Sequence, residues 1–314
     1  MFDITAIGEI LIDLTQSGLT EQGIPRFDAN PGGAPANLAV AAARLGARSA
    51  FIGRVGRDGY GDFLRRTLER NGVDARGLSV DPAQHTTLAV VTLDASGERS
   101  FSFYRDPSAD VELRFEDIPA ELLAQTRVLH FGSVSLTAEP ARSATLAAVR
   151  AAKERGARIS YDPNYRARLW PDEASAVEQM LRPLPLVDIL KVSDEELALL
   201  TGTADLEVGS ARLQAAGIPL VLVTLGADGA FYRFGEHTGR VPGVPVAVGD
   251  TNGAGDTFFG AALARLVAYD RPDALTPEAL EEILHFANRA AAVTASRHGA
   301  IPAMPTLDEL RELP

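Results

Sequence analysis

The chain has 314 residues, of which 46% are hydrophobic and 23% charged, and this composition is typical of a globular protein with a large core. Acidic residues outnumber basic ones by 42 to 30, for a formal net charge of −12. A field of that sign repels nucleic acids and anionic membranes, so we expect neither as a partner. An anionic ligand must therefore be held by local groups such as arginines, helix N-termini or a metal ion.

The chain contains no cysteine, which excludes disulfides, thiolate zinc sites and cysteine nucleophiles. It begins MFDITAIGEI, without the basic segment of a secretory signal. No apolar run reaches the roughly 18 to 20 residues that a membrane-spanning helix needs. These features predict a cytoplasmic protein.

Strands and helices are predicted to alternate along most of the chain. We expect a first strand within the apolar run 2–11 and a helix over 34–45, with a proline in its first turn and a glycine just after its end. Further strands are predicted at 49–55, 128–131, 158–162, 189–192 and 220–225, and further helices at 60–71, 138–155, 257–268 and 277–298. This alternation predicts a doubly wound α/β fold, a mostly parallel sheet with helices on both faces, in a single domain spanning 1–314.

Two segments, 13–30 and 86–105, break this alternation. The second contains the β-rich runs TTLAVVTL and RSFSFYR on either side of DASGE, which predicts a hairpin. One interpretation makes 86–105 an antiparallel edge of the main sheet. We favour the other, in which both segments build a small second sheet that forms a lid over the ends of the parallel strands.

The strongest chemical signal is DTNGAGDTF, directly before an apolar helix. Gly253 and Gly255 let successive backbone N–H groups converge at a helix N-terminus, which makes an anion site. Asp256 falls in the first helical turn, where it can accept a proton from a substrate hydroxyl, and we expect the helix dipole to lower its pKa. Such a weak base suits phosphoryl transfer, which depends mainly on positioning. Taken alone, a tight turn with a capping aspartate would be the simpler interpretation.

Other nucleotide and metal signatures are absent from the sequence. There is no G-x-x-x-x-G-K-[ST], GAGDTF lacks the third glycine of the dinucleotide fingerprint, and the five histidines have no metal-ligand spacing. A P-loop enzyme, a dinucleotide-dependent oxidoreductase and a metalloenzyme are therefore disfavoured.

Polar residues at strand ends indicate a binding site for a small polar molecule. Gly32 and Gly33 allow a ligand to approach the backbone closely, and Asn37 offers both a donor and an acceptor. Asp13 follows the first strand, where α/β proteins bind ligands, and its carboxylate can accept hydrogen bonds from two ligand hydroxyl groups. Asn164 and Arg166 follow the predicted strand 158–162, and Arg166 is a candidate phosphate clamp or a surface salt-bridge partner.

The motifs together resemble the ribokinase/PfkB family of carbohydrate kinases over essentially the whole length. The matching stretches, in chain order, are GGAPANLAVAAARLG, GRVGRDGYGD, TLGADGA and DTNGAGDTFFGA. FSFYRDPSAD, LHFGSVSL, YDPNYRARLW and SDEELALLTG are similar to the fructokinase branch. The resemblance implies a ribokinase-like α/β core with a β-sheet lid, in agreement with the predicted organisation.

The resemblance also implies roles for individual positions. Asp256 would be the catalytic base, and the backbone of Gly253, Ala254 and Gly255 the anion hole for the transferring phosphoryl group. The implied sugar-contacting residues are Asp13, Gly33, Asn37, Arg105 and Asn164, with Arg166 between sugar and phosphates. The implied ATP-binding residues are Ser193, Thr224, Gly226, Gly229 and Asn288, the last of them beside the adenine.

Two positions depart from the family pattern. The usual N-x-x-E, which tunes Mg²⁺ and phosphate, is Ser193-x-x-Glu196 here, so the carboxylate is kept and the amide replaced by a hydroxyl. Asn252 stands where threonine is commonest. The family often binds a monovalent cation such as K⁺ near Asp250 and the loop 295–299.

We therefore expect an ATP- and Mg²⁺-dependent fructokinase that produces fructose 6-phosphate. A kinase of a sugar acid such as 2-keto-3-deoxygluconate is an alternative, because Arg105 and Arg166 can pair with a carboxylate. A non-catalytic sugar or nucleotide sensor is an alternative of another class, against which the intact Asp256 argues. We also expect a homodimer through the edges of the lid sheet.

Overall fold

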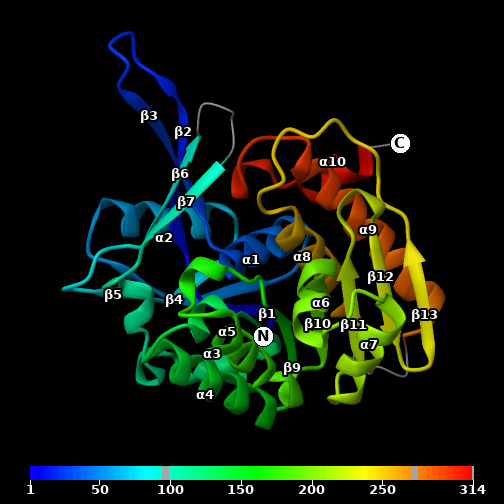
Figure 1. Ribbon diagram of the computed structural model, residues 1–314. Helices are drawn as coiled ribbons and strands as arrows, with labels where there is room; N and C mark the ends of the chain where they lie inside the picture. Colours follow the sequence, from blue (N-terminus) through cyan, green and yellow to red (C-terminus); the bar gives the residue numbers. More distant parts are fainter. Residues whose placement is uncertain (94–98, 270–274, 313–314) are drawn as a thin grey trace.

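The computed structural model of the chain describes residues 1–93, 99–269 and 275–312. Its main sheet has nine strands in the order β13-β12-β11-β10-β9-β8-β1-β4-β5 (Figure 1). Seven neighbouring strands of this sheet pair in parallel, namely β11, β10, β9, β8, β1, β4 and β5. Strands β12 and β13 add an antiparallel edge. Their bounds are β1 Phe2–Ile7, β4 Ser49–Gly56, β5 Asp74–Asp81, β8 Thr126–Gly132, β9 Arg158–Asp162, β10 Ile189–Ser193, β11 Leu220–Thr224, β12 Ala230–Phe234 and β13 His237–Val241.

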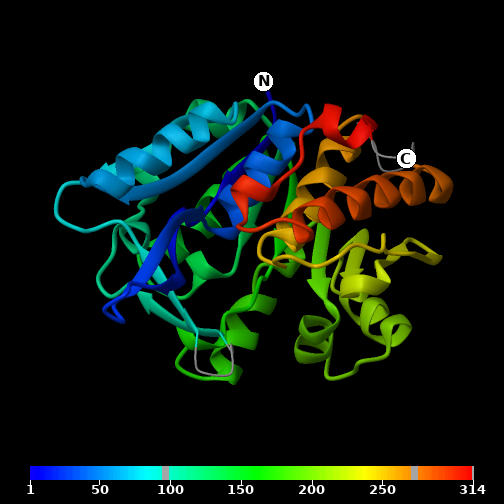
Figure 2. The same ribbon diagram turned by 90° about the horizontal axis from the view of Figure 1, so that it is seen from above.

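Helices cover both faces of this sheet, as Figure 2 shows. One face carries α3 Ala120–Ala124, α4 Ala141–Glu154, α5 Glu173–Leu181, α6 Asp194–Thr201 and α7 Leu206–Ala215, whose apolar side chains share one buried cluster with the strands. The other carries α1 Ala34–Arg44, α2 Gly59–Arg70, α8 Ala254–Leu266, α9 Pro277–Ala295 and α10 Leu307–Glu312. The predicted doubly wound α/β fold is therefore confirmed.

A separate sheet of four strands projects from the main sheet (Figure 1). It consists of β2 Leu11–Leu19, β3 Pro25–Gly32, β6 Leu88–Leu93 and β7 Arg99–Tyr104, in the order β3-β2-β6-β7. Strands β6 and β7 pair antiparallel as expected, while the DASGE turn between them lies outside the described residues. The second sheet predicted from 13–30 and 86–105 is confirmed. The alternative was wrong, because the antiparallel edge of the main sheet is the β12–β13 hairpin.

The first strand lies within the apolar run 2–11, as expected, but the end of this run already begins a strand of the second sheet. Strand β1 ends at Ile7 and β2 begins at Leu11, so the chain leaves the main sheet at Gly8 and enters the second sheet three residues later. The short connection contains Glu9 and Ile10, both buried. The apolar residues continue from β1 through Ile10 to Leu11 at the start of β2, and this continuity hides the break.

Strand β1 marks the point where the strand order reverses. The chain builds outward from β1 through β4 and β5 on one side, and through β8, β9, β10 and β11 on the other. In open α/β sheets such a point leaves a crevice at the carboxyl ends of the strands, where ligands bind. The second sheet rises from the carboxyl end of β1, beside this crevice.

None of the helices in the described ranges combines the length and the apolar character needed to cross a membrane.

Candidate active site

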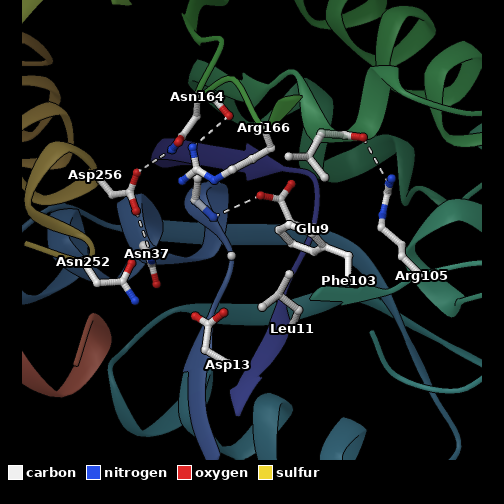
Figure 3. Close-up of a pocket in the computed structure, with 13 residues that line it drawn as sticks. Glu9, Leu11, Asp13, Asn37, Phe103, Arg105, Asn164, Arg166, Asn252 and Asp256 are labelled. Carbon is white, nitrogen blue, oxygen red and sulfur yellow. Dashed lines mark hydrogen bonds between the residues drawn. The ribbon is translucent and has the colours of Figure 1, made fainter. Parts of the chain in front are cut away.

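Three adjoining cavities lie at the carboxyl ends of the parallel strands. The first, of about 70 Å³, lies between the main sheet and the second sheet (Figure 3). The second, of about 270 Å³, shares Asn164, Arg166, Asn252 and Asp256 with the first. The third, of about 600 Å³, shares Thr251 and Gly255 with the second and is walled mainly by alanine, glycine and valine. The cavities therefore form one elongated site, and Asp256 lies where the first two meet.

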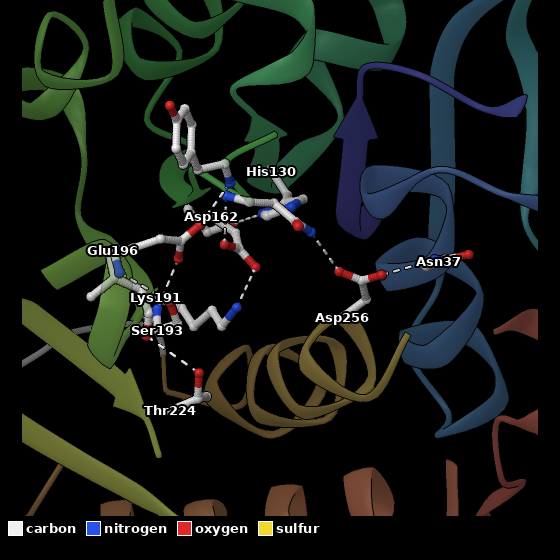
Figure 4. A network of polar contacts seen from close by, with 12 residues as sticks. Asn37, His130, Asp162, Lys191, Ser193, Glu196, Thr224 and Asp256 are labelled. Atoms are coloured by element: carbon white, nitrogen blue, oxygen red, sulfur yellow. Dashed lines mark hydrogen bonds and ion pairs between the residues drawn. The ribbon is translucent and has the colours of Figure 1, made fainter. Parts of the chain in front are cut away.

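Asp256 is held by an amide on each side of its carboxylate (Figure 4). Asn37 Nδ2 in α1 donates to Oδ2 at 2.8 Å, and Asn164 Nδ2 after β9 donates to Oδ1 at 3.0 Å. Helix α8 begins at Ala254, three residues before the predicted start, and Gly253 caps it with a left-handed φ of 76°. The carboxylate is thus fixed in the first turn of α8, facing the first two cavities.

The expectation that the helix dipole lowers the pKa of Asp256 is not met. Burial raises the pKa of this carboxyl above its usual value, since Asp256 is only 7% exposed. The Asn37 amide, the Lys191 ammonium and the Arg166 guanidinium oppose that shift without cancelling it. Loss of solvent thus outweighs the charges and dipoles around the carboxylate, and Asp256 is a stronger base than its position on a helix suggests.

Asn37 and Asn164 each carry a second feature that fits a binding site. Asn37 Oδ1 is buried and has no hydrogen-bond partner among the described residues. Because Asn37 lines the first cavity, this oxygen can accept a hydrogen bond from a ligand hydroxyl. Asn164 adopts a left-handed backbone conformation with φ 47°, which costs less for asparagine than for most residues. This conformation turns the chain sharply after β9 and aims the Asn164 amide at Asp256.

Asp13 reaches the first cavity because Gly32, on the neighbouring strand β3, has no side chain. A Cβ atom on Gly32 would lie 2.2 Å from Asp13 Oδ2, so a side chain at that position would displace the carboxylate. Burial raises the pKa of Asp13 to about 6, and the nearby Arg166 charge partly offsets the shift. Gly32 therefore shapes the cavity indirectly, while Gly33, Ala34 and Asp13 line it.

The two arginines of the site differ in how firmly they are held. Arg105 is buried, with Nε 2.8 Å from Asp110 Oδ2, Nη1 on Thr137 Oγ1 and Nη2 on the Val134 carbonyl. Arg166 is exposed, donates through Nη1 to backbone carbonyls of its own loop, and lines both the first and the second cavity. Arg105 thus forms a fixed wall, and Arg166 lies between the two cavities.

Glu196 and Ser193 form a capping box at the end of β10 (Figure 4). The Glu196 carboxylate accepts N–H bonds from Ser193 at 2.8 Å and from Tyr165 at 2.7 Å, while the Ser193 hydroxyl accepts from the Glu196 N–H. One carboxylate thus ties the end of β10 to the loop that carries Asn164 and Arg166. Like Gly32, Ser193 and Glu196 are predicted site residues that lie outside the walls of the three cavities.

The remaining predicted residues line the second and third cavities. Thr224, Gly226, Gly229, Ala254 and Asn288 line the third, and Gly253 and Gly255 line the second. Asn288 is buried and donates through Nδ2 to the Val241 and Pro242 carbonyls, which ties α9 to the end of β13. Asp250 lines the second cavity, and its Oδ2 accepts the Gly299 N–H, which connects it to the loop 295–299.

Sequence reasoning missed two charged residues in the cavity walls. Glu9 lines the first cavity, where its Oε1 accepts the Ala34 N–H and its Oε2 is buried without a hydrogen-bond partner in the described ranges. Lys191 lines the second cavity, with its Nζ 2.9 Å from Asp162 Oδ2. Both lie within apolar strand-like runs. The only sequence signal for them is a charged residue in an otherwise apolar run.

Comparison with known proteins shows the family of this chain. The sequence profile of the pfkB family carbohydrate kinases matches residues 1–307. The chain belongs to this family. As a carbohydrate kinase, it transfers a phosphoryl group to a sugar hydroxyl.

Several relatives of this carbohydrate kinase are fructokinases. Fructokinase-1 of Oryza sativa subsp. japonica is 45% identical over 313 residues, which cover 99% of this chain and 97% of the relative. The crystal structure of fructokinase with bound ATP from Xylella fastidiosa matches with a TM-score of 0.92 and 36% identity, over 99% of this chain and 98% of that one. A double mutant of the Vibrio cholerae O395 fructokinase, solved with fructose, ADP and potassium ion bound, matches with a TM-score of 0.88 and 38% identity, over 98% and 96% of the two chains.

Proposed function

We propose that this carbohydrate kinase is an ATP-dependent fructokinase, which phosphorylates the 6-hydroxyl of D-fructose. The observation that carries the proposal is the position of Asp256 at the junction of a small polar cavity and the glycine-lined cavity beneath the GAGD turn. A sugar in the first cavity and the phosphates of ATP in the second would meet at this carboxylate. The apolar third cavity would hold the adenine and ribose, beside Asn288, Gly226 and Gly229.

The residues of the first cavity favour a neutral sugar over a sugar acid. The carboxylates of Asp13 and Asp256 line it together with Glu9, whose pKa burial raises to about 7, and their negative charge would repel a substrate carboxylate. The guanidinium of Arg105 is already committed to Asp110, Thr137 and Val134. Carboxylate and amide oxygens instead suit a ligand that presents hydroxyl donors.

The proposed reaction transfers the terminal phosphoryl group in line. Asp256 takes the proton of the fructose hydroxyl as its oxygen bonds to the γ-phosphorus, and the bond from that phosphorus to the leaving ADP oxygen breaks. The backbone N–H groups of Gly253, Ala254 and Gly255 would stabilise the charge on the phosphoryl oxygens. Asn37 and Asn164 keep the base aimed at the hydroxyl, and closure of the second sheet would exclude water that competes as acceptor.

We expect Mg²⁺ to enter this site bound to the nucleotide rather than to be held by a metal site of the protein itself. Among the described residues, no group of three or more His, Cys, Asp or Glu side chains could hold a metal ion. The two Glu196 oxygens each accept a backbone N–H, so this carboxylate suits an indirect contact through water. When bound with ATP, Mg²⁺ supplies positive charge to the phosphates. For a monovalent ion such as K⁺, we propose the region of Asp250 and the loop 295–299.

A panel of acceptor sugars tests the proposed substrate. ADP release with MgATP is measured with fructose, ribose, tagatose, nucleosides and 2-keto-3-deoxygluconate. We expect kcat/KM for fructose to exceed that for the other acceptors by orders of magnitude. A maximum with the sugar acid would overturn the substrate assignment, and ATP binding without turnover of any sugar would favour a sensor.

The affinity for fructose should depend on pH through Asp13. Its pKa is raised to about 6, so the carboxylate is ionised and accepts hydroxyl groups above that pH, and it is protonated below it. We expect the fructose KM to rise about tenfold or more as pH falls below 6, because a charge-assisted hydrogen bond is lost. Asp13→Asn should have a raised KM that changes much less over this range, with the remaining change due to Glu9, whose pKa burial raises to about 7 in the same cavity. An unchanged wild-type KM between pH 7 and pH 5 would refute the role of Asp13.

We also propose a homodimer that forms through the second sheet. Leu19, Ile24, Phe27 and Tyr104 are exposed on this sheet and its β2–β3 turn, at 59%, 60%, 39% and 63%. Burying them against a second copy would remove an apolar surface from water. Light scattering should give twice the chain mass for the wild type and a monomer for a variant with Leu19→Lys and Ile24→Lys. A monomeric wild type at micromolar concentration would contradict the proposal.

A further inference from the structure

A buried lysine lies directly beneath the GAGD turn. Lys191 projects from the middle of β10 and is 6% exposed, with its Nζ 2.9 Å from Asp162 Oδ2 at the end of β9 (Figure 4). The same side chain lines the second cavity together with Gly253, Gly255 and Asp256. A charge is expensive to bury, so a lysine that is retained beside an open cavity calls for an explanation beyond packing.

The ammonium of Lys191 has unused donors that face this cavity. Within the described part of the chain, its hydrogen-bond partner is Asp162, which occupies one of three N–H groups. A Cβ atom on Gly255 would lie 3.2 Å from Lys191 Nζ. The glycine therefore leaves the space between the ammonium and the GAGD backbone open, and any larger residue would fill it.

The surrounding groups keep Lys191 positively charged. Burial works against the charged form, but the carboxylates of Asp162, Glu196 and Asp256 outweigh it and raise the pKa of Lys191. The buried His130, which stacks edge-on against Phe259, has its pKa lowered to about 3 by burial and by the Lys191 charge, so it is neutral. Lys191 and Arg166 are thus the two cationic side chains among the described residues that line the second cavity.

We propose that the Lys191 ammonium binds the transferring phosphoryl group of ATP in the second cavity, beside the backbone N–H groups of the GAGD turn. The proposal rests on the kinase function proposed above and adds a residue to it. The ammonium makes and breaks no covalent bond, and it stays protonated while the phosphoryl oxygens pass from ADP to the sugar. Asp162 acts as a positioning residue that holds the ammonium in the cavity wall. Removal of such a preorganised donor lowers kcat by about 10²–10³-fold in other enzymes.

Two variants separate this role from the structural role of the ion pair. Asp162→Asn alone removes the opposing charge but keeps an amide oxygen that can accept a hydrogen bond from the ammonium and so hold it in the cavity wall. Asp162→Asn combined with Lys191→Met lacks both charges, so no unpaired ion is buried. We compare kcat at saturating fructose and MgATP, the affinity for ADP, and the affinity for ADP with aluminium fluoride in the presence of fructose and Mg²⁺. Circular dichroism melting establishes that each variant is folded.

The double variant should have a kcat about 100-fold below that of Asp162→Asn. Its affinity for ADP should stay within threefold, because ADP lacks the transferring group, while the tighter binding of ADP with aluminium fluoride should be lost. Equal kcat values in the two variants, or a loss of ADP affinity as large as the loss in kcat, would overturn the proposal.

The test of Lys191 can fail or succeed independently of the proposal that the substrate is fructose. If the wild type phosphorylates another sugar, the substrate assignment fails, and the same comparison with that sugar still decides the role of Lys191. If Asp162→Asn does not fold, Lys191→Gln in the otherwise unchanged chain takes its place. Wild-type kcat in Lys191→Gln would then overturn the proposal, and a 100-fold loss with intact ADP affinity would support it.

Discussion

Replacing Asp256 by asparagine should lower kcat for fructose phosphorylation by about 10²–10⁴-fold, the usual contribution of a general base. The variant keeps the size of the side chain and an oxygen for one of the two flanking amides, Asn37 and Asn164. The affinities for fructose and ATP should therefore change by less than tenfold. ADP release gives kcat, and isothermal titration calorimetry gives the two affinities.

Asp62→Asn is the matched control for this change. Asp62 also lies in the first turn of a helix, α2, but it is exposed and does not line any of the three cavities. Both substitutions remove one negative charge at a helix N-terminus, so a general electrostatic effect would appear in both. Wild-type turnover in Asp256→Asn, or an equal loss in Asp62→Asn, would refute the assignment of the base.

Asp256→Asn should also raise the free energy of unfolding of the protein in the absence of substrate. Burial raises the pKa of Asp256, so the folded state at neutral pH carries a carboxylate that would be more stable in water. The destabilisation is absent at a pH below the usual value of 3.8 and is present above the raised value. Buried functional groups commonly lower the stability of a protein in this way because its activity requires them.

Local sequence signals were sufficient for the part of the site that lies on a single segment. The GAGD turn, its helix and the position of Asp256 in the first turn could all be predicted, because glycine spacing and helix periodicity act over a few residues. Asn164 and Arg166 after β9 could be predicted for a similar reason, since parallel strands bring their carboxyl ends to one edge of the sheet. Asp13, by contrast, lies within β2 of the second sheet and not directly after β1.

The contacts between segments could not be predicted in this way. Asn37 and Asn164 meet at one carboxylate from positions 219 and 92 residues away, and the sequence does not encode which oxygen each amide contacts. The pKa of Asp256 was predicted in the wrong direction because the helix dipole is a local property, whereas burial depends on all the surrounding elements. Lys191 was missed for the same reason: its partner Asp162 lies on the neighbouring strand β9.

Gly33→Ala should both destabilise the protein and weaken the binding of fructose. Gly33 has a φ of 104°, and an added Cβ atom would lie 2.6 Å from the Glu9 carbonyl oxygen, a backbone atom that cannot move aside cheaply. Forcing apart Gly33 and Glu9 would shift the Ala34 N–H that donates to Glu9 Oε1 in the wall of the first cavity. We therefore expect a higher KM for fructose and little change in the affinity for ADP, whose proposed site is farther along the elongated cavity.

Gly72→Ala separates the two causes of this destabilisation. Gly72 also has a left-handed φ, of 76°, but an added Cβ atom would meet nothing within 4 Å. It should lower the free energy of unfolding by about 1–2 kcal/mol through backbone strain alone. Gly33→Ala should exceed that by about 1–3 kcal/mol, because it adds a steric overlap. Urea denaturation measures both, and an equal loss in the two variants would mean that the contact between Gly33 and Glu9 does not constrain the wall of the sugar cavity.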